Sequence, residues 1–230
     1  MNIYIHTIFP EIFESFLNTS LIKKAQEKWI LNIKLVNIRD FCTHKQKQVD
    51  DKIYGWWVGM LIKAKPVIDS IENTIKENNL KDFKIIYLAP SENILDQQKC
   101  FDYSKNENII LLAWRYEWID IRVEQYFQDK YNNFERLSIG KYVLLWWELP
   151  AMVFIESVWR LIPWVIKEEM SFKDESYNIE KNMENIEYPQ YTRPEEVYGY
   201  KVPEVLLSGH DAKIEQWRKE NERKITDLTN

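Results

Sequence analysis

The stretch Phe83-Lys84-Ile85-Ile86-Tyr87-Leu88, followed later by Ile109-Ile110-Leu111-Leu112-Ala113, decides the fold class of this 230-residue chain. Each run is almost continuously apolar, whereas a strand with one face in water alternates between apolar and polar residues. A strand without that alternation is typical of a parallel sheet that is covered on both faces. The two runs therefore predict buried parallel strands.

Strand-like and helix-like segments alternate on both sides of these runs. Asn2–Phe9 and Ile30–Ile38 are short and alternate in part between apolar and polar residues, which predicts strands. Apolar residues at helical spacing predict helices over Pro10–Lys28, Pro66–Lys76, Ile119–Phe127 and Leu149–Ile162. Strands that alternate with helices predict an α/β domain with a largely parallel sheet over residues 1–165.

Two further regions have a different composition. Residues 39–60 are polar and rich in turn formers, and we predict a long functional loop there. Residues 166–194 are polar and acidic with few aliphatic side chains, which predicts a flexible linker. Beyond it, His210–Lys224 is a charged helical segment with Ile214 and Trp217 on one face. We predict a second, small, mostly helical domain over residues 195–230.

Charge and cysteine content narrow the function classes. With 31 basic and 36 acidic residues the net charge is −5, so any nucleic-acid site must be a local basic patch on an acidic body. No apolar run approaches the roughly 18 residues of a membrane span, and no signal peptide is visible. Cys42 and Cys100 lack metal-ligand spacing, which predicts a cytoplasmic protein without a disulfide framework or zinc site.

Glycine and tryptophan occur in unusual numbers, 5 and 10 respectively. Glycine makes up about 7% of an average chain and supplies backbone conformations that tryptophan cannot. The pairs Trp56-Trp57 and Trp146-Trp147 stand beside turn residues rather than inside apolar runs. One interpretation is an aromatic-rich core or a surface on which sugars or bases stack.

Motifs along nearly the whole chain carry a resemblance to one family. The family patterns are RDF, VDD, YGGGxGM, GRYEGID, SIGDYVLxGGELPAM, YPQYTRP and KVPEVLLSGxH. The matching segments here are Arg39–Phe41, Val49–Asp51, Tyr54–Met60, Arg115–Asp120, Ser138–Met152, Tyr188–Pro194 and Lys201–His210. In this order and spacing they resemble the bacterial tRNA (guanine-N1)-methyltransferases of the TrmD family.

The excess tryptophans coincide with glycines of that family. One tryptophan, Trp159, falls on a small-residue position of the family. Eight others fall on family glycines: Trp29, Trp56, Trp57, Trp114, Trp118, Trp146, Trp147 and Trp164. Only Trp217 matches a family tryptophan. Nine independent replacements would each overpack a tight site at about 1–3 kcal/mol. We therefore hypothesise that UGA codons meaning glycine were translated as tryptophan.

The resemblance implies an α/β fold with a deep trefoil knot of the SPOUT class, a flexible linker and a small helical C-terminal domain, assembled as a homodimer. It also implies S-adenosylmethionine as cofactor, held by three loops of the knot. The cofactor-binding positions carried over are Leu88, Ala89, Pro90, Trp114, Tyr116, Glu117, Trp118, Ser138, Ile139, Gly140, Tyr142, Leu144, Trp146, Trp147 and Pro150. In one loop Ser91-Glu92 replaces the family's Gln-Gly, which puts one cofactor contact in doubt.

The implied reaction is methylation of N1 of the guanosine at position 37 of tRNA, next to the anticodon. N1 of neutral guanine carries a proton, so a carboxylate base is needed, and a cation can stabilise charge that develops on O6. Arg160 corresponds to the family's catalytic arginine. Counting without gaps from Arg160, the family's aspartate base corresponds to Glu175, with Asp174 one step earlier.

Partners follow from the same resemblance. Arg39, Lys45, Asp50 and Lys52 in the 39–60 loop are candidates for contact with tRNA. The family also uses Mg²⁺, although nothing in the sequence locates a metal site. If the tryptophans are real, they would fill the cofactor cleft, and the alternative is a catalytically inactive homologue that still binds tRNA.

Overall fold

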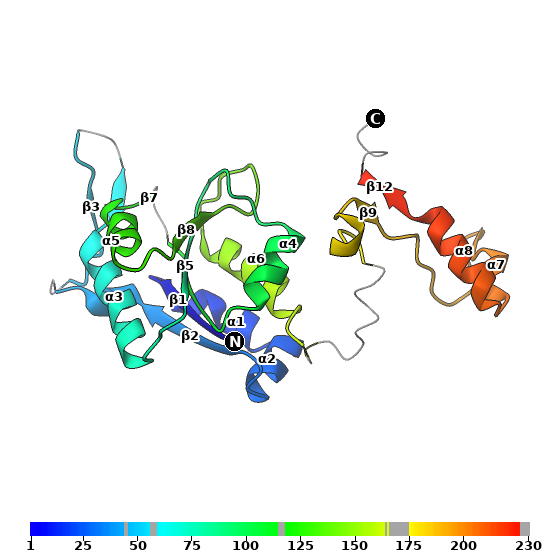
Figure 1. The fold of residues 1–230 in the computed structure, drawn as a ribbon, viewed down its shortest axis with the longest axis horizontal. Coiled ribbons are helices and arrows are strands. Elements are labelled where there is room, and N and C mark those ends of the chain that lie inside the picture. Colours follow the sequence, from blue (N-terminus) through cyan, green and yellow to red (C-terminus); the bar gives the residue numbers. More distant parts are fainter. Residues whose placement is uncertain (44–45, 56–58, 115–117, 164, 166–174, 226–230) are drawn as a thin grey trace. The chain divides into compact units, whose positions relative to one another are not determined.

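The structure is a computed structural model that describes residues 1–43, 46–55, 59–114, 118–163, 165 and 175–225. The chain divides into two compact units, Met1–Ile166 and Lys167–Asn230. The first unit holds the large sheet and the hydrophobic core (Figure 1).

A five-stranded sheet forms the centre of the first unit, with strand order β2-β1-β6-β5-β8. All four pairings between neighbouring strands are parallel, as the apolar runs predict. The strands are β1 (Asn2–Thr7), β2 (Asn32–Asn37), β5 (Lys84–Leu88), β6 (Asn108–Leu112) and β8 (Phe134–Leu137). Nearly all of β5 and β6 is buried, which explains why these two strands lack alternation.

Helices cover both faces of this sheet. Figure 1 shows α3 (Ala64–Glu77) and α5 (Arg122–Tyr131) together on one side, and α4 (Gln97–Ser104) and α6 (Glu148–Trp159) on the other. The two helices of each pair are in contact. Helix α6 is apolar around most of its circumference, with Phe154, Ile155 and Val158 fully buried.

Three asparagines form a ladder across the amino ends of the central strands. Asn32 Nδ2 donates to Asn2 Oδ1 at 3.1 Å, and Asn2 Nδ2 donates to Asn108 Oδ1 at 2.9 Å. Asn108 Nδ2 in turn donates to the carbonyl of Asp82 at 2.9 Å. The three residues are register partners on β2, β1 and β6. Polar side chains thus pair with one another at the edge of an otherwise apolar sheet.

Several elements differ from the sequence prediction. The segment Pro10–Lys28 is not one helix but a 3₁₀ turn (Pro10–Phe13), α1 (Glu14–Leu17) and α2 (Ser20–Glu27). The break lies at Asn18-Thr19, where Thr19 is extended, and Ser20 at the start of α2 adopts a left-handed φ of 49°. The 39–60 segment is not only loop, because β3 (Asp50–Lys52) and β4 (Met60–Ile62) pair with each other, and β4 pairs with β7 (Trp118–Ile119).

The second unit has helices and two small sheets in its described part. Helices α7 (Glu204–Leu207) and α8 (Asp211–Asn221) lie in its C-terminal half. One hairpin joins β10 (Glu196–Val197) to β11 (Tyr200–Lys201), and β9 (Asn185–Ile186) pairs with β12 (Arg223–Lys224). The Trp217 ring lies 6.3 Å from the rings of both Tyr188 and Tyr191, so the Tyr188–Tyr191 segment packs on α8.

Candidate functional site

Three loops begin at one edge of the central sheet, where the adjacent strands β6, β5 and β8 end. Tyr87 is the register partner of Leu112, and Leu88 is the partner of Leu137, so the three carboxyl ends are level. Ligands of open parallel sheets bind in the crevice outside such carboxyl ends. These are the loops to which the family resemblance assigns the cofactor.

Backbone hydrogen bonds connect the loops. The Ser138 N–H donates to the carbonyl of Asn93 at 2.9 Å, and the Leu95 N–H donates to the carbonyl of Ser138 at 2.7 Å. The Trp147 N–H donates to the carbonyl of Trp114 at 3.3 Å. The structure therefore brings together segments that lie far apart in the sequence.

The predicted cofactor residues differ in exposure. Leu88, Ala89, Trp114, Ser138, Trp147 and Pro150 are buried, and Pro90, Ile139, Gly140 and Leu144 are half-buried. Trp118, Tyr142 and Trp146 are exposed. Tyr116 and Glu117 lie outside the described residues. A Cβ at Gly140 would collide with the ring of the exposed Tyr142, which would have to move aside.

Aromatic rings fill the space between the loops. The Trp114 and Trp147 rings are stacked, with centroids 5.1 Å apart and planes 13° apart, and Trp114 lies 4.0 Å from Tyr87. Trp114 is fully buried, and its Nε1 has no hydrogen-bond partner among the described residues. Leaving such a donor unpaired costs about 1–3 kcal/mol. With both indoles in place, the residues present do not fit S-adenosylmethionine.

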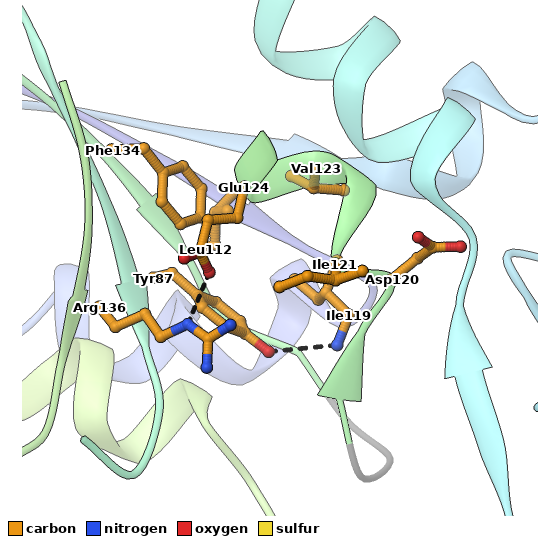
Figure 2. A pocket seen from close by; sticks show the side chains of 9 residues that line it. All are labelled: Tyr87, Leu112, Ile119, Asp120, Ile121, Val123, Glu124, Phe134 and Arg136. Atoms are coloured by element: carbon orange, nitrogen blue, oxygen red, sulfur yellow. Dashed lines mark hydrogen bonds and ion pairs between the residues drawn. The ribbon is translucent and has the colours of Figure 1, made fainter. Parts of the chain in front are cut away.

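Tyr87 also anchors the far end of the loop that follows β6. Its buried hydroxyl accepts a hydrogen bond from the Ile119 N–H at 3.1 Å, at the edge of a small pocket (Figure 2). Burial raises the pKa of Tyr87 far above its ordinary value, so the hydroxyl stays protonated. Across the pocket, Arg136 Nε donates to Glu124 Oε2 at 2.6 Å. Trp114 and Ile119, on either side of residues 115–117, are thus each held by a hydrogen bond.

Glu148 is a buried carboxylate beside the third loop that the sequence prediction did not single out. It lies at the first turn of α6, is fully buried, and accepts a hydrogen bond from Thr7 Oγ1 at 3.1 Å. Thr7 Oγ1 also accepts from the Phe9 N–H at 3.1 Å. The bond joins the carboxyl end of β1 to the helix that follows the third loop. A single carboxylate at the start of a long apolar helix was the available signal.

The predicted catalytic residues belong to different units. Arg160 directly follows α6 in the first unit. Glu175 is half-buried in the second unit, where its carbonyl accepts from Asn185 Nδ2 at 2.8 Å. Asp174 lies outside the described residues.

Three of the four predicted tRNA-contacting residues are described, Arg39 just after β2 and Asp50 and Lys52 on β3. Arg39 follows β2, and its guanidinium lies 5.7 Å from the Phe9 ring centre. Asp50 and Lys52 lie on β3, where Asp50 is half-buried and Lys52 is exposed. Lys45 lies outside the described residues. Of the two described basic candidates, Lys52 is exposed and Arg39 is half-buried.

Comparison with known families now identifies the chain. Residues 1–229 match the family model described as tRNA (Guanine-1)-methyltransferase TrmD. The chain belongs to the TrmD family. Among similar proteins, the tRNA (guanine-N(1)-)-methyltransferase of Clostridioides difficile is 42% identical over 226 residues, covering 98% of this chain and 94% of the relative. That of Ruminiclostridium cellulolyticum is 45% identical over 212 residues, covering 92% and 87%.

The TrmD match includes both units of this chain, since it extends to residue 229. In the part of the TrmD-family chain that the structure describes, no three metal-binding side chains come together. No described helix has both the length and the apolar character needed to cross a membrane.

Proposed function

We propose that this TrmD-family chain, with glycine at the anomalous tryptophan positions, methylates N1 of guanosine 37 in tRNA with S-adenosylmethionine as methyl donor. The convergence of the loops after β5, β6 and β8 carries the proposal, because the family assigns the cofactor to them. We further propose that residues 1–165 form the knotted domain, 166–194 the catalytic linker and 195–230 a tRNA-binding domain.

Backbone geometry at Trp29 supports the glycine hypothesis. Trp29 has a φ of 60° directly after α2. The Ile30 N–H donates to the Ala25 carbonyl at 3.1 Å, and the Trp29 N–H donates to the Gln26 carbonyl at 3.0 Å. These two bonds define a Schellman motif, whose left-handed position is usually glycine. Tryptophan is a poor residue for that backbone conformation.

A second helix end in the same unit provides a comparison. After α3, the Leu80 N–H donates to the Ile75 carbonyl at 3.0 Å, and the Asn79 N–H donates to the Lys76 carbonyl at 3.2 Å. Asn79 takes the left-handed position with a φ of 48°. Asparagine tolerates that conformation well. Two helices of this unit thus end in the same motif. Its left-handed position is occupied by a residue that tolerates this conformation at Asn79 and by one that does not at Trp29.

The buried tryptophans give unequal support. Trp114 leaves its Nε1 without a partner among the described residues and fills the space between the loops together with Trp147. Glycine at these two positions would remove both indoles and open that space to a ligand. Trp159 differs, since its Nε1 donates to Glu156 Oε2 at 2.9 Å. The structure accommodates tryptophan at position 159.

In the proposed mechanism the side chains of the chain supply proton transfer and charge stabilisation. Glu175, or its neighbour Asp174, accepts the N1 proton of guanine, which turns N1 into a nucleophile. Arg160 donates hydrogen bonds to the guanine O6, where negative charge develops as the proton leaves. Replacing a general base typically lowers the rate about 10²–10⁴-fold. Glu175→Gln and Asp174→Asn, assayed separately for methyl transfer, identify which carboxylate acts.

Two measurements test the proposal. Calorimetry with S-adenosylmethionine compares the chain as written with a form that carries glycine at all nine positions: 29, 56, 57, 114, 118, 146, 147, 159 and 164. We expect only the glycine form to bind. If the glycine form fails to bind, the cofactor proposal is wrong. The gene sequence supplies the second test, because UGG codons throughout would refute the recoding hypothesis.

An inactive tRNA-binding homologue is the second candidate. The indole stack of Trp114 and Trp147 favours it if both residues are real. In that case the chain as written would bind tRNA through Arg39, Lys45, Asp50 and Lys52 but would not bind the cofactor. A filter-binding assay with tRNA, run beside the calorimetry, distinguishes this candidate from the enzyme.

We also propose that the protein is a cytoplasmic homodimer that uses Mg²⁺ in catalysis, as the family resemblance implies. Exposed apolar side chains support the dimer: Val143 and Leu145 precede α6, and Leu149 and Val153 lie one turn apart on it. Contiguous exposed apolar surface marks interaction sites. Val153→Lys should shift the sedimentation coefficient to that of a monomer, and an unchanged dimer would remove this surface as the interface.

A further inference from the structure

Asn185 is almost completely buried in the second unit, with 5% of its surface exposed, and it binds the segment that contains Glu175. Its Nδ2 donates to the Glu175 carbonyl at 2.8 Å. Its Oδ1 accepts from the Asn178 N–H at 2.8 Å. Its own carbonyl accepts from the Tyr177 N–H at 2.9 Å. One buried residue therefore fixes the backbone on both sides of Ser176.

A reciprocal pair of hydrogen bonds reinforces this arrangement. The Ser176 N–H donates to Glu187 Oε1 at 3.3 Å, and the Glu187 N–H donates to Ser176 Oγ at 3.0 Å. The segment Glu175–Asn178 is thus bound to the segment Asn185–Glu187 through both backbone and side-chain groups. We call these two segments together the base clamp.

The base clamp is attached to the end of α8. Asn185 is the register partner of Lys224, and Ile186 is the partner of Arg223. The Ile225 N–H donates to the Glu184 carbonyl at 2.9 Å, and Lys181 Nζ donates to Glu222 Oε1 at 2.6 Å. Residue 175 therefore belongs to a hydrogen-bonded body that includes the C-terminal helix, although the sequence assigns it to a linker.

We propose that Asn185 is a positioning residue, which holds the backbone of Glu175 so that its carboxylate is presented to the guanine in one orientation. The inference rests on the proposed role of Glu175 as general base. A base on an unrestrained chain would have to lose backbone freedom in each reaction cycle. A misplacement of about 1 Å at a reacting group can cost about 10²-fold in rate.

Three variants distinguish loss of the clamp hydrogen bonds from a general loss of stability of the second unit. Asn185→Asp keeps the acceptor for the Asn178 N–H but removes the donor to the Glu175 carbonyl, and Asn185→Leu removes both side-chain hydrogen bonds at similar volume. Asn221→Leu is the matched control, because Asn221 Nδ2 donates to the Trp217 carbonyl in the same unit and Asn221 is not one of the clamp residues. All three are made both in the written chain and in the nine-glycine form.

Hydrogen exchange provides a readout that is independent of activity. In the written chain we expect Asn185→Leu to speed amide exchange at Tyr177 and Asn178 about tenfold, since local opening becomes easier when their partners are lost or weakened. Asn221→Leu should leave these two amides unchanged. Unchanged exchange in both Asn185 variants would overturn the clamp.

Kinetics of the nine-glycine form test the consequence. We expect Asn185→Leu to lower kcat about 10–100-fold, with the KM for tRNA and the affinity for S-adenosylmethionine unchanged. Asn185→Asp should also lower kcat, since it places an acceptor oxygen against the Glu175 carbonyl. Faster exchange at Tyr177 and Asn178 with an unchanged kcat would overturn the positioning role. Full activity of both Glu175→Gln and Asp174→Asn would instead refute the base assignment, so the two failures are distinguishable.

Discussion

Replacing Trp29 by glycine should stabilise the first unit, although it removes the largest side chain. A residue with a Cβ pays about 1–2 kcal/mol in the left-handed region, where Trp29 has a φ of 60°. Glycine regains this but loses about 0.5–1 kcal/mol through its greater freedom in the unfolded chain. The indole is 85% exposed, so little burial is lost. The expected gain is about 0.5–1 kcal/mol.

Thermal unfolding followed by calorimetry measures this gain. For a domain of this size, 1 kcal/mol corresponds to a rise in Tm of about 2–4 °C. Asn79→Gly is the matched control, because Asn79 occupies the same position of the same motif and already tolerates its φ of 48°. We expect Asn79→Gly to change Tm by less than about 1 °C. A fall in Tm for Trp29→Gly, or an equal rise for both variants, would refute the reasoning from backbone strain.

Three further predictions concern buried polar groups of the first unit. Burial lowers the pKa of His6 from 6.5 to about 3, so only the unfolded chain gains a proton as the pH falls from 7 to 5. The free energy of unfolding, measured with urea, should therefore drop by about 2 kcal/mol between these pH values. His6→Gln should lack this drop. Tyr87→Phe leaves the Ile119 N–H without its partner and should cost about 1–3 kcal/mol in the same assay, whereas an unchanged midpoint would show that water replaces the hydroxyl. Thr7→Val removes the hydroxyl that donates to buried Glu148 and should also lower the free energy of unfolding by about 1–3 kcal/mol. A stability equal to that of the parent chain would contradict a structural role for this bond.

The sequence predicted the parallel sheet because β5 and β6 are buried on both faces and need no polar residues. It did not predict β8, where Phe134-Glu135-Arg136-Leu137 has two charged residues out of four. Those charges are paired within the fold, Glu135 with Lys84 Nζ at 3.5 Å and Arg136 with Glu124 at 2.6 Å. Pairing of this kind depends on residues distant in the sequence, which a local pattern cannot reveal.

The candidate site was predictable to the extent that it lies in motifs. The loops at Leu88, Trp114 and Ser138 were found through the family resemblance, and the structure brings them to one edge of the sheet. Glu148 was missed although it lies within a motif, because its importance depends on burial and on the distant Thr7. Asn185 was missed because an asparagine in a polar, acidic segment looks like any other solvated residue.

The asparagine ladder of Asn32, Asn2 and Asn108 has a consequence for the alignment of the strands. Strands with one wet face resist a shift by one residue, because the shift would expose their apolar side chains. In β6 every residue is buried, so apolar residues would remain buried after such a shift, and hydrophobicity alone hardly distinguishes one alignment from the next. The amides at the opposite ends of these strands do distinguish them, because each shift breaks a hydrogen bond between buried or half-buried groups. Specificity for a single alignment, and with it the common level at which the loops begin, is therefore encoded at the edge of the sheet farthest from those loops.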